Sequence, residues 1–265
     1  MVYIGIITLN DNFNYGNRLQ NYALEHFLRR LKCNTNTIWY RKENSKLNKK
    51  YATFNNLRRY IFNRHNYKSY IDKHILFNDI IREYNFKKFG DKYINSVFDY
   101  EVKPDLNDKF DYFIAGSDQI WNPTFSDLKN EFLQFADRNK RVAYAASFGV
   151  SEIKPDKIEE VKKGLKGIDF ISVREQAGAK IVKDLTGKDV PVLVDPTLLL
   201  TAEDWEKVME RPVWYRDEKY ILVYFLSKLP DKIKNDIKNL AEKYKLKIID
   251  LMDRENIDYY CSPPE

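Results

Sequence analysis

Short apolar runs alternate with segments of helical periodicity along most of this chain, and this alternation limits its fold more than any other feature. Turn residues bound each run, and apolar residues recur every three or four positions in the segments between them. The predicted strands are residues 2–9, 36–40, 110–116, 141–149, 169–175 and 190–196. Short strands separated by helices form parallel sheets with both faces covered. The sequence therefore predicts an α/β fold with a parallel sheet.

The segments between the runs show where helices should lie. In the first of them Leu19, Ala23, Phe27 and Leu31 would share one face, which we expect to pack against the sheet. A later helix ends at Gly187, which is placed as a C-cap.

Residues 44–95 interrupt this alternation. They are basic, rich in Tyr, Phe and Asn, and mostly helical in period, so we interpret them as a helical insertion in an N-terminal domain of residues 1–215. The insertion could be a helical cap with a solvated basic face, a surface that receives an anionic or lipid-linked substrate, or a nucleic-acid surface.

A second α/β unit begins after the polar stretch at residues 210–219. Residues 216–265 hold a predicted strand at 220–226, a helix, and a strand at 246–251, which together form a βαβ unit at the beginning of a second domain. Two strands and one helix leave both sheet edges exposed. We therefore expect an incomplete C-terminal domain whose open side is covered by further chain, a partner, or a second copy in a homo-oligomer.

Composition excludes several classes of protein. No stretch approaches the roughly 18 to 20 apolar residues of a membrane helix, and the first run has neither a basic leader nor a cleavage site, so we expect a cytoplasmic protein. The formal charge of +6 suits an anionic small ligand and does not require nucleic acid. Cys33 and Cys261 lack a CxxC partner, so no disulfide framework, metal site or cofactor is expected.

Polar clusters follow five of the predicted strands. In parallel α/β sheets the carboxyl ends of the strands meet at one edge, where ligands bind near helix N-termini. The clusters are Asn14–Gln20, Gly116–Asn122, Ser147 with Gly149, Arg174–Glu175, and Asp195–Pro196.

Each cluster also has a purely structural interpretation. Gly16 could relieve a strand-to-helix turn, and Asn17 could be a helix N-cap. Asp118 could form an Asx turn, and Arg174 could pair with Glu175 or another acid at the surface.

Five motifs, in this order and spacing, resemble the polysaccharide pyruvyl transferase family. They are "YGNRLQNYAL", "AGSDQIWNP", "VAYAASFG", "FISVREQAGAKIV" and "VPVLVDPTLLL". The resemblance implies a GT-B-like pair of Rossmann-like domains. It also implies transfer of pyruvate from phosphoenolpyruvate to two saccharide hydroxyls as a cyclic ketal, in surface polysaccharide assembly. The acceptor would be a saccharide or a lipid-linked saccharide, which would bring the protein to the inner membrane surface.

The resemblance also implies roles for particular residues. Arg174 would hold the carboxylate or phosphate of the donor, and Asp118 would orient or deprotonate the attacking hydroxyl. The predicted substrate-binding set is completed by Asn17, Gln20, Gly16 and Ser117.

The chain departs from the family in one respect. Family members carry a Ser-Phe-His-Gly segment whose histidine helps to move the proton, and this sequence has none. Its three histidines, His26, His65 and His74, fall on helical stretches, where surface or packing roles are expected. We therefore expect this chain alone to be inactive. The alternative interpretation is a GT-B glycosyltransferase or a noncatalytic saccharide-binding relative.

Overall fold

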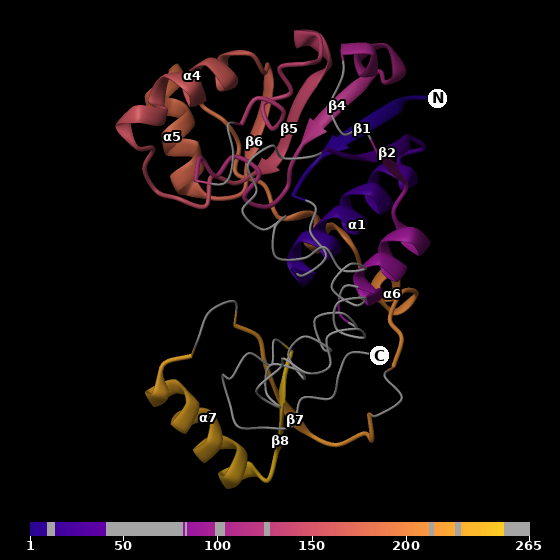
Figure 1. Ribbon diagram of the computed structural model, residues 1–265, viewed down its shortest axis with the longest axis vertical. Coiled ribbons are helices and arrows are strands. Elements are labelled where there is room, and N and C mark those ends of the chain that lie inside the picture. Colours follow the sequence, from indigo (N-terminus) through magenta and orange to yellow (C-terminus); the bar gives the residue numbers. More distant parts are fainter. Residues whose placement is uncertain are drawn as a thin grey trace, which may run out of the picture. The chain divides into compact units, whose positions relative to one another are not determined.

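The computed structural model describes residues 1–9, 14–40, 82, 84–98, 104–124, 128–211, 215–225 and 229–251. The chain divides into two compact units, Met1–Tyr51 with Lys87–Lys207 and Ala52–Phe86 with Val208–Glu265. Each unit has its own sheet (Figure 1). The predicted domains, residues 1–215 and 216–265, stay a prediction, because most of residues 52–86 and all of 252–265 lie outside the described residues.

The first unit is built on a six-stranded sheet with the strand order β3-β2-β1-β4-β5-β6. All its strand pairs are parallel. The strands are β1 (Tyr3–Ile7), β2 (Asn34–Trp39), β3 (Ser96–Phe98), β4 (Tyr112–Ala115), β5 (Arg141–Ala146) and β6 (Phe170–Val173). This is the strand order of Rossmann folds, and the chain direction across the sheet reverses between β1 and β4. The predicted α/β fold is confirmed, although β3 was not anticipated.

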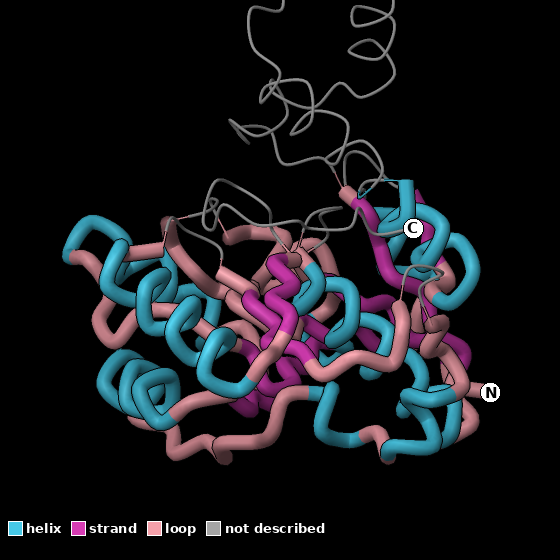
Figure 2. Tube along the Cα trace, turned by 90° about the horizontal axis from the view of Figure 1, so that it is seen from below, coloured by secondary structure: helices cyan, strands magenta, loops and turns pink. Residues whose placement is uncertain are grey.

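Helices cover both faces of this sheet (Figures 1 and 2). The unit contains the helices α1 (Tyr15–Arg30), α4 (Ile158–Lys166), α5 (Gln176–Thr186) and α6 (Ala202–Glu206), with short 3-10 segments η2 (Pro104–Lys109), η3 (Arg138–Lys140), η4 (Pro155–Lys157) and η5 (Pro196–Leu199). Leu24 and Leu28 of α1 pack with Ile4 and Ile6 on one face. Ile7 belongs to the larger core shared with α4 and α5, because successive strand residues point to opposite faces.

The buried face of α1 differs from the predicted one. Leu19 and Leu31 are 37% and 60% exposed, whereas the side chains of Gln20, Asn21 and Glu25 are buried. The strands beneath α1 carry threonine hydroxyls, and these polar partners allow the helix to bury amides and a carboxylate there. Apolar periodicity therefore misassigned part of this face.

Glu25 fixes α1 to the sheet through hydrogen bonds. Its carboxylate accepts from Thr37 Oγ1 at 2.6 Å, from Asn95 N at 3.1 Å, and from Arg29. Burial raises the pKa of Glu25, while the hydrogen bond from Thr37 and the charge of Arg29 act in the opposite direction. A buried carboxylate with these partners holds α1 in one position over β2, and so positions the first turn of α1 at the carboxyl edge.

The chain after α5 confirms one prediction and corrects another. Gly187 is the C-cap of α5, with φ of 75°. Residues 190–196 do not form the predicted strand and make a single parallel bridge, between Val173 and Val192. Pro191 and Pro196 lack the N–H groups that a longer ladder would need.

A strand, a helix and a second strand are described in residues 215–251 of the second unit. β7 (Tyr220–Val223) and β8 (Lys247–Asp250) pair in parallel, and α7 (Asp231–Tyr244) connects them. Val223, Leu229, Ala241 and Ile248 form a small core. The predicted strand, helix and strand are therefore present. The predicted insertion at 44–95 lies largely outside the described residues, but residues 84–93 are helical.

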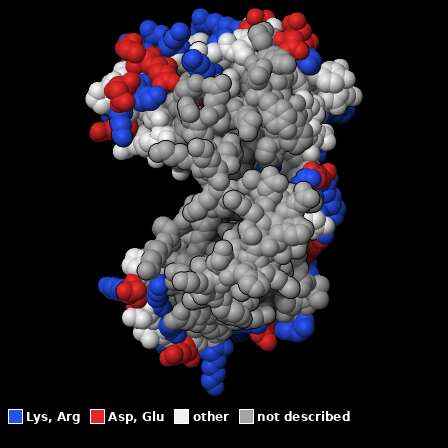
Figure 3. All heavy atoms as spheres, in the orientation of Figure 1, with Lys and Arg blue, Asp and Glu red and all other residues white. Residues whose placement is uncertain are grey.

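The described surface carries charges of both signs. Figure 3 shows Lys and Arg side chains interspersed with Asp and Glu on the visible face of the molecule. No helix in the described part of the chain is long and apolar enough to cross a bilayer.

Asp204 in α6 ties this short helix to α1. Its carboxylate accepts from Arg30 Nη1 at 2.9 Å and from Thr201 N at 3.2 Å, and it lies 3.6 Å from His26 Nε2. The Thr201 backbone N–H, followed by Lys207 and Arg30, lowers the pKa of Asp204 to about 2, although burial acts in the opposite direction.

We expect Asp204→Asn to make the free energy of unfolding depend less on pH in the acid range. A carboxyl group whose pKa is lowered by folding stabilises the fold above its unfolded pKa, about 3.9 for Asp. That contribution should be lost as pH falls through the folded value of about 2. Urea unfolding of both proteins between about pH 5 and pH 2 measures this, and their difference in unfolding free energy should shrink toward the acid end. A constant difference would contradict the assignment.

Candidate functional site

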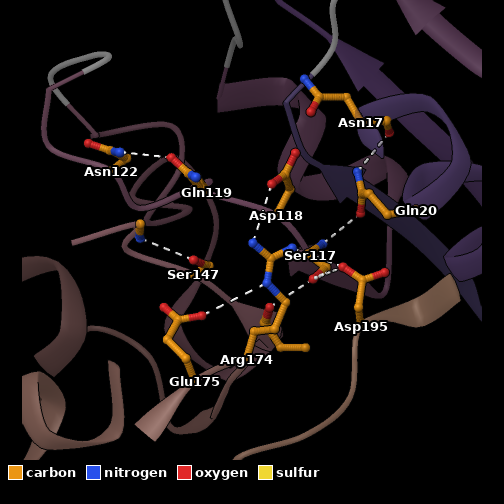
Figure 4. Close-up of polar contacts among 12 residues, drawn as sticks. Asn17, Gln20, Ser117, Asp118, Gln119, Asn122, Ser147, Arg174, Glu175 and Asp195 are labelled. Atoms are coloured by element: carbon orange, nitrogen blue, oxygen red, sulfur yellow. Dashed lines mark hydrogen bonds and ion pairs between the residues drawn. The ribbon is translucent and has the colours of Figure 1, made fainter. Parts of the chain in front are cut away.

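The predicted site residues gather at the carboxyl edge of the six-stranded sheet. The strand order reverses between β1 and β4, and ligands of such sheets bind outside the strand ends at that point. The loops after β1, β4 and β6 and the first turn of α1 contribute side chains to this edge (Figure 4).

The first turn of α1 begins at a different cap from the predicted one. Asn14 is the N-cap, and its side-chain oxygen accepts from Asn17 N at 3.3 Å. Gly16 is exposed and its backbone is helical, so it does not relieve a turn. Asn17 is only 4% exposed. The substrate contacts of Gly16 and Asn17 stay predictions.

Gln20 braces the ends of two strands. Its Nε2 donates to Thr8 Oγ1 at 2.8 Å, and its Oε1 accepts from Ser117 N at 3.0 Å. Thr8 follows β1, and Ser117 follows β4. The amide of Gln20 therefore joins the two strands on either side of the reversal, and its contact with a sugar hydroxyl stays a prediction.

The loop after β4 lies directly against β5. A Cβ atom on Gly116 would lie 2.1 Å from the carbonyl oxygen of Tyr144, and Gly116 has φ of 130°. The next residue, Ser117, is fully buried, with its Oγ 2.9 Å from Ala145 O and 3.3 Å from Asp195 Oδ2. A glycine is required at position 116 for this close approach.

Asp118 leaves the same loop with its side chain toward β6. It has φ of 61°, and its carbonyl oxygen accepts from Ser147 N at 2.9 Å. Its carboxylate is 18% exposed and lies 3.4 Å from Arg174 Nη2. The backbone of Asp118 is thus fixed to the loop after β5, while its carboxylate faces Arg174.

Arg174 lies among three carboxylates at the end of β6 (Figure 4). Its Nη1 is 2.9 Å from Asp195 Oδ2, its Nη2 is 3.4 Å from Asp118 Oδ1, and its Nε is 3.9 Å from Glu175 Oε2. Its side chain is 27% exposed. Three acids around one cation leave a net negative cluster, so an anion reaching Arg174 must replace a carboxylate that is already there.

Asp195 is a member of this cluster to which the sequence assigned no role. Besides Arg174, its carboxylate accepts from Thr197 N at 3.0 Å and from Thr197 Oγ1 at 2.8 Å, and it caps η5. The Asp-Pro-Thr order is a recognisable capping pattern. That pattern explains the hydrogen bonds from Thr197 to Asp195. It does not indicate the contact with Arg174, because that contact depends on the approach of residues 190–196 to β6.

A groove of about 630 Å³ lies elsewhere on this unit. It is lined by β5, by β6 and by residues 188–191, and none of the predicted site residues lines it. Tyr144 lines the groove, and burial, together with the charge of Asp195, raises the pKa of its hydroxyl. Size alone therefore does not identify the site, whereas the polar cluster lies at the carboxyl edge of the sheet and includes Asp118 from the loop after β4.

The cluster is not arranged as a metal centre. Among the described residues, no group of His, Cys, Asp and Glu side chains could hold a metal ion. Of the histidines, His26 contacts Tyr22 and Asp204, and His65 and His74 lie outside the described residues.

Comparison with known proteins identifies one family. The family model described as polysaccharide pyruvyl transferase matches residues 14–264, nearly the whole chain. No curated protein and no solved structure matches the sequence. The match includes the first turn of α1, the loop after β4, and the segments that hold Arg174 and Asp195. The chain therefore belongs to the polysaccharide pyruvyl transferase family.

Proposed function

We propose that this protein acts in the transfer of a pyruvyl group from phosphoenolpyruvate to two hydroxyls of a saccharide, forming a cyclic ketal. The acceptor would be a saccharide or a lipid-linked saccharide of a surface polysaccharide, presented at the cytoplasmic side of a membrane. The observation that carries the proposal is Arg174, which lies among carboxylates at the carboxyl edge of the six-stranded sheet, in a chain of this family.

The reaction sets the demands on the site. A proton adds to the methylene carbon of the donor, and the resulting oxocarbenium-like carbon takes the first hydroxyl oxygen. Phosphate then leaves with its bridging oxygen, and the second hydroxyl oxygen takes its place. The two hydroxyl protons are balanced by the new methyl group and the released phosphate.

Residues of the cluster can meet two requirements of this reaction, which are to hold the anionic donor and to orient the saccharide hydroxyls. Arg174 offers planar N–H groups suited to the donor carboxylate or phosphate. Asp118 and Glu175 offer carboxylate oxygens that can accept hydrogen bonds from saccharide hydroxyls. We assign Gln20 and Ser117 to holding the loop after β4, because both are buried and engaged with neighbouring strands.

The proton for the methylene carbon is the third demand. We propose that residues 1–265 bind the donor but do not complete the transfer alone, since His26, the one histidine in the described part of the chain, is engaged with Tyr22 and Asp204 and not with the cluster. General acid catalysis typically contributes about 10² to 10⁴-fold in rate. Phosphate release and acceptor mass, followed with galactose- and mannose-containing acceptors, should therefore show no turnover. Robust turnover would contradict this part of the proposal and support the transfer itself.

Donor binding tests the function directly. We expect phosphoenolpyruvate to raise the melting temperature of the protein in a concentration-dependent way, because a ligand of the folded state stabilises it by mass action. Sugar nucleotides at matched concentrations should have no effect. Stabilisation by a sugar nucleotide alone would favour a GT-B glycosyltransferase, and stabilisation by oligosaccharides alone would favour a noncatalytic saccharide-binding protein.

A further inference from the structure

The carboxylate partners of Arg174 are unequal. The contact of Nη1 with Asp195 is 2.9 Å, within the range of strong charge-assisted hydrogen bonds. The contact of Nη2 with Asp118 is 3.4 Å, near the outer limit for a hydrogen bond. One side of the guanidinium is therefore firmly held, and the other is weakly engaged.

Asp195 is itself firmly oriented. Its Oδ1 accepts two hydrogen bonds from Thr197, and its Oδ2 lies within hydrogen-bond distance of Arg174 Nη1 and Ser117 Oγ. Ser117 is fully buried. A carboxylate with donors on both oxygens has little freedom to rotate, so it can determine the orientation of the arginine.

The carboxylate of Asp118 has fewer hydrogen-bond partners than that of Asp195. Within the described part of the chain, its carboxylate forms an ion pair with Arg174 alone. Its backbone is fixed by Ser147 N and Ile120 N, so the carboxylate can turn away from Arg174 without moving the loop.

We propose that Asp195 is the positioning residue of Arg174, and that the anionic donor exchanges with Asp118 at Nη2 of Arg174. An anion cannot approach the cluster closely while Asp118 occupies Nη2, because like charges at close range repel. Exchange replaces one carboxylate by another group of the same charge. It also frees Asp118 to accept a hydrogen bond from an acceptor hydroxyl. Donor binding therefore prepares the acceptor site, and this inference rests on the proposed function.

Three substitutions of the same kind test the exchange. Asp195→Asn keeps a side chain that caps helices as well as Asp does, but loses the charge that holds Arg174. We expect it to raise the Kd of phosphoenolpyruvate about 10- to 100-fold, as for loss of one hydrogen bond to a charged group. Asp118→Asn removes the competing carboxylate, so the Kd should be lower than in the wild type. The matched control is Asp169→Asn, which breaks an exposed pair with Arg138 and should leave the Kd unchanged.

Calorimetric titration of the 265-residue chain with phosphoenolpyruvate measures all three. If Asp118→Asn weakens donor binding as much as Asp195→Asn does, Asp118 helps to hold Arg174 and the exchange is wrong. Donor affinity of Asp195→Asn equal to that of the wild type overturns the positioning role. Thermal melting of each variant shows whether a change in donor affinity comes from misfolding. If Asp195→Asn is misfolded, the donor affinity of Asp118→Asn alone tests the proposed exchange.

A second measurement does not depend on the donor. In NMR spectra of the side-chain guanidinium, hindered rotation of Arg174 should be seen in the wild type and in Asp118→Asn, and lost in Asp195→Asn. Unchanged rotation in Asp195→Asn overturns the positioning role even if phosphoenolpyruvate does not bind. Absence of donor binding by the wild type, with rotation changed as expected, would instead count against the proposed function and the exchange.

Discussion

Replacing Arg174 by alanine should weaken binding of phosphoenolpyruvate by about 2 to 5 kcal/mol, the usual cost of removing one partner of a buried charge pair. The lower half of this range is expected, because the side chain is 27% exposed and solvent screens part of the interaction. The substitution also leaves Asp118 and Asp195 facing each other without a cation between them, which adds repulsion against an anionic ligand. Isothermal titration of the purified variant gives the change in Kd.

Two further variants define what Arg174 supplies. Arg174→Lys keeps the charge but offers one ammonium group, which cannot hold Asp195 and an anion in the same planar arrangement. Its affinity for phosphoenolpyruvate should therefore lie between those of the wild type and Arg174→Ala. Arg138→Ala removes an arginine that is 61% exposed and paired with Asp169, and it should leave donor binding unchanged. Donor affinity in Arg174→Ala equal to that in Arg138→Ala would remove Arg174 from the site.

Replacing Gly116 by alanine should destabilise the fold by about 2 to 6 kcal/mol, since backbone strain and overpacking each cost about 1 to 3 kcal/mol. The added Cβ would lie 2.1 Å from the carbonyl oxygen of Tyr144, a distance that non-bonded atoms do not reach. That oxygen belongs to β5, so the clash can be relieved only by moving a central strand or the loop that carries Ser117 and Asp118. Urea unfolding followed by circular dichroism measures the loss.

Gly187→Ala is the matched control for this change. Gly187 also has positive φ, 75°, but a Cβ there would meet nothing within 4 Å. It should cost about 1 to 2 kcal/mol, the penalty for an L residue in the left-handed region. Equal losses in the two variants would mean that the approach of Gly116 to β5 is not a steric requirement of the fold.

Local patterns in the sequence predicted much of the first unit. The apolar runs of β1, β4, β5 and β6 and the C-cap at Gly187 are properties of neighbouring residues, so they can be recognised without the fold. The parallel sheet then follows from the alternation of strands with helices. Because parallel strands end at one edge, the gathering of Gln20, Ser117, Asp118 and Arg174 followed as well.

Contacts between distant segments could not be predicted in the same way. The buried side of α1 depends on threonines of β2, which the helix sequence does not reveal. The ion pair of Arg174 with Asp195 depends on residues 190–196 lying beside β6 with only one bridge, where a strand was expected. The sequence therefore indicated which side chains gather, and that an acid could pair with Arg174, but not that Asp195 is its nearest partner.

The brace that Gln20 forms between β1 and β4 has a consequence for how this protein can evolve. Replacing Gln20 would remove its hydrogen bonds to Thr8 Oγ1 and from Ser117 N, both of them buried. A substitution at Gln20 alone should therefore destabilise the fold. Asp118 and Glu175 reach Arg174 through longer contacts, 3.4 and 3.9 Å, and are partly exposed. Substitutions that change the ligand of this edge should therefore accumulate at Asp118 and Glu175. Gln20 and Ser117 should be retained together, even in descendants that bind a different ligand.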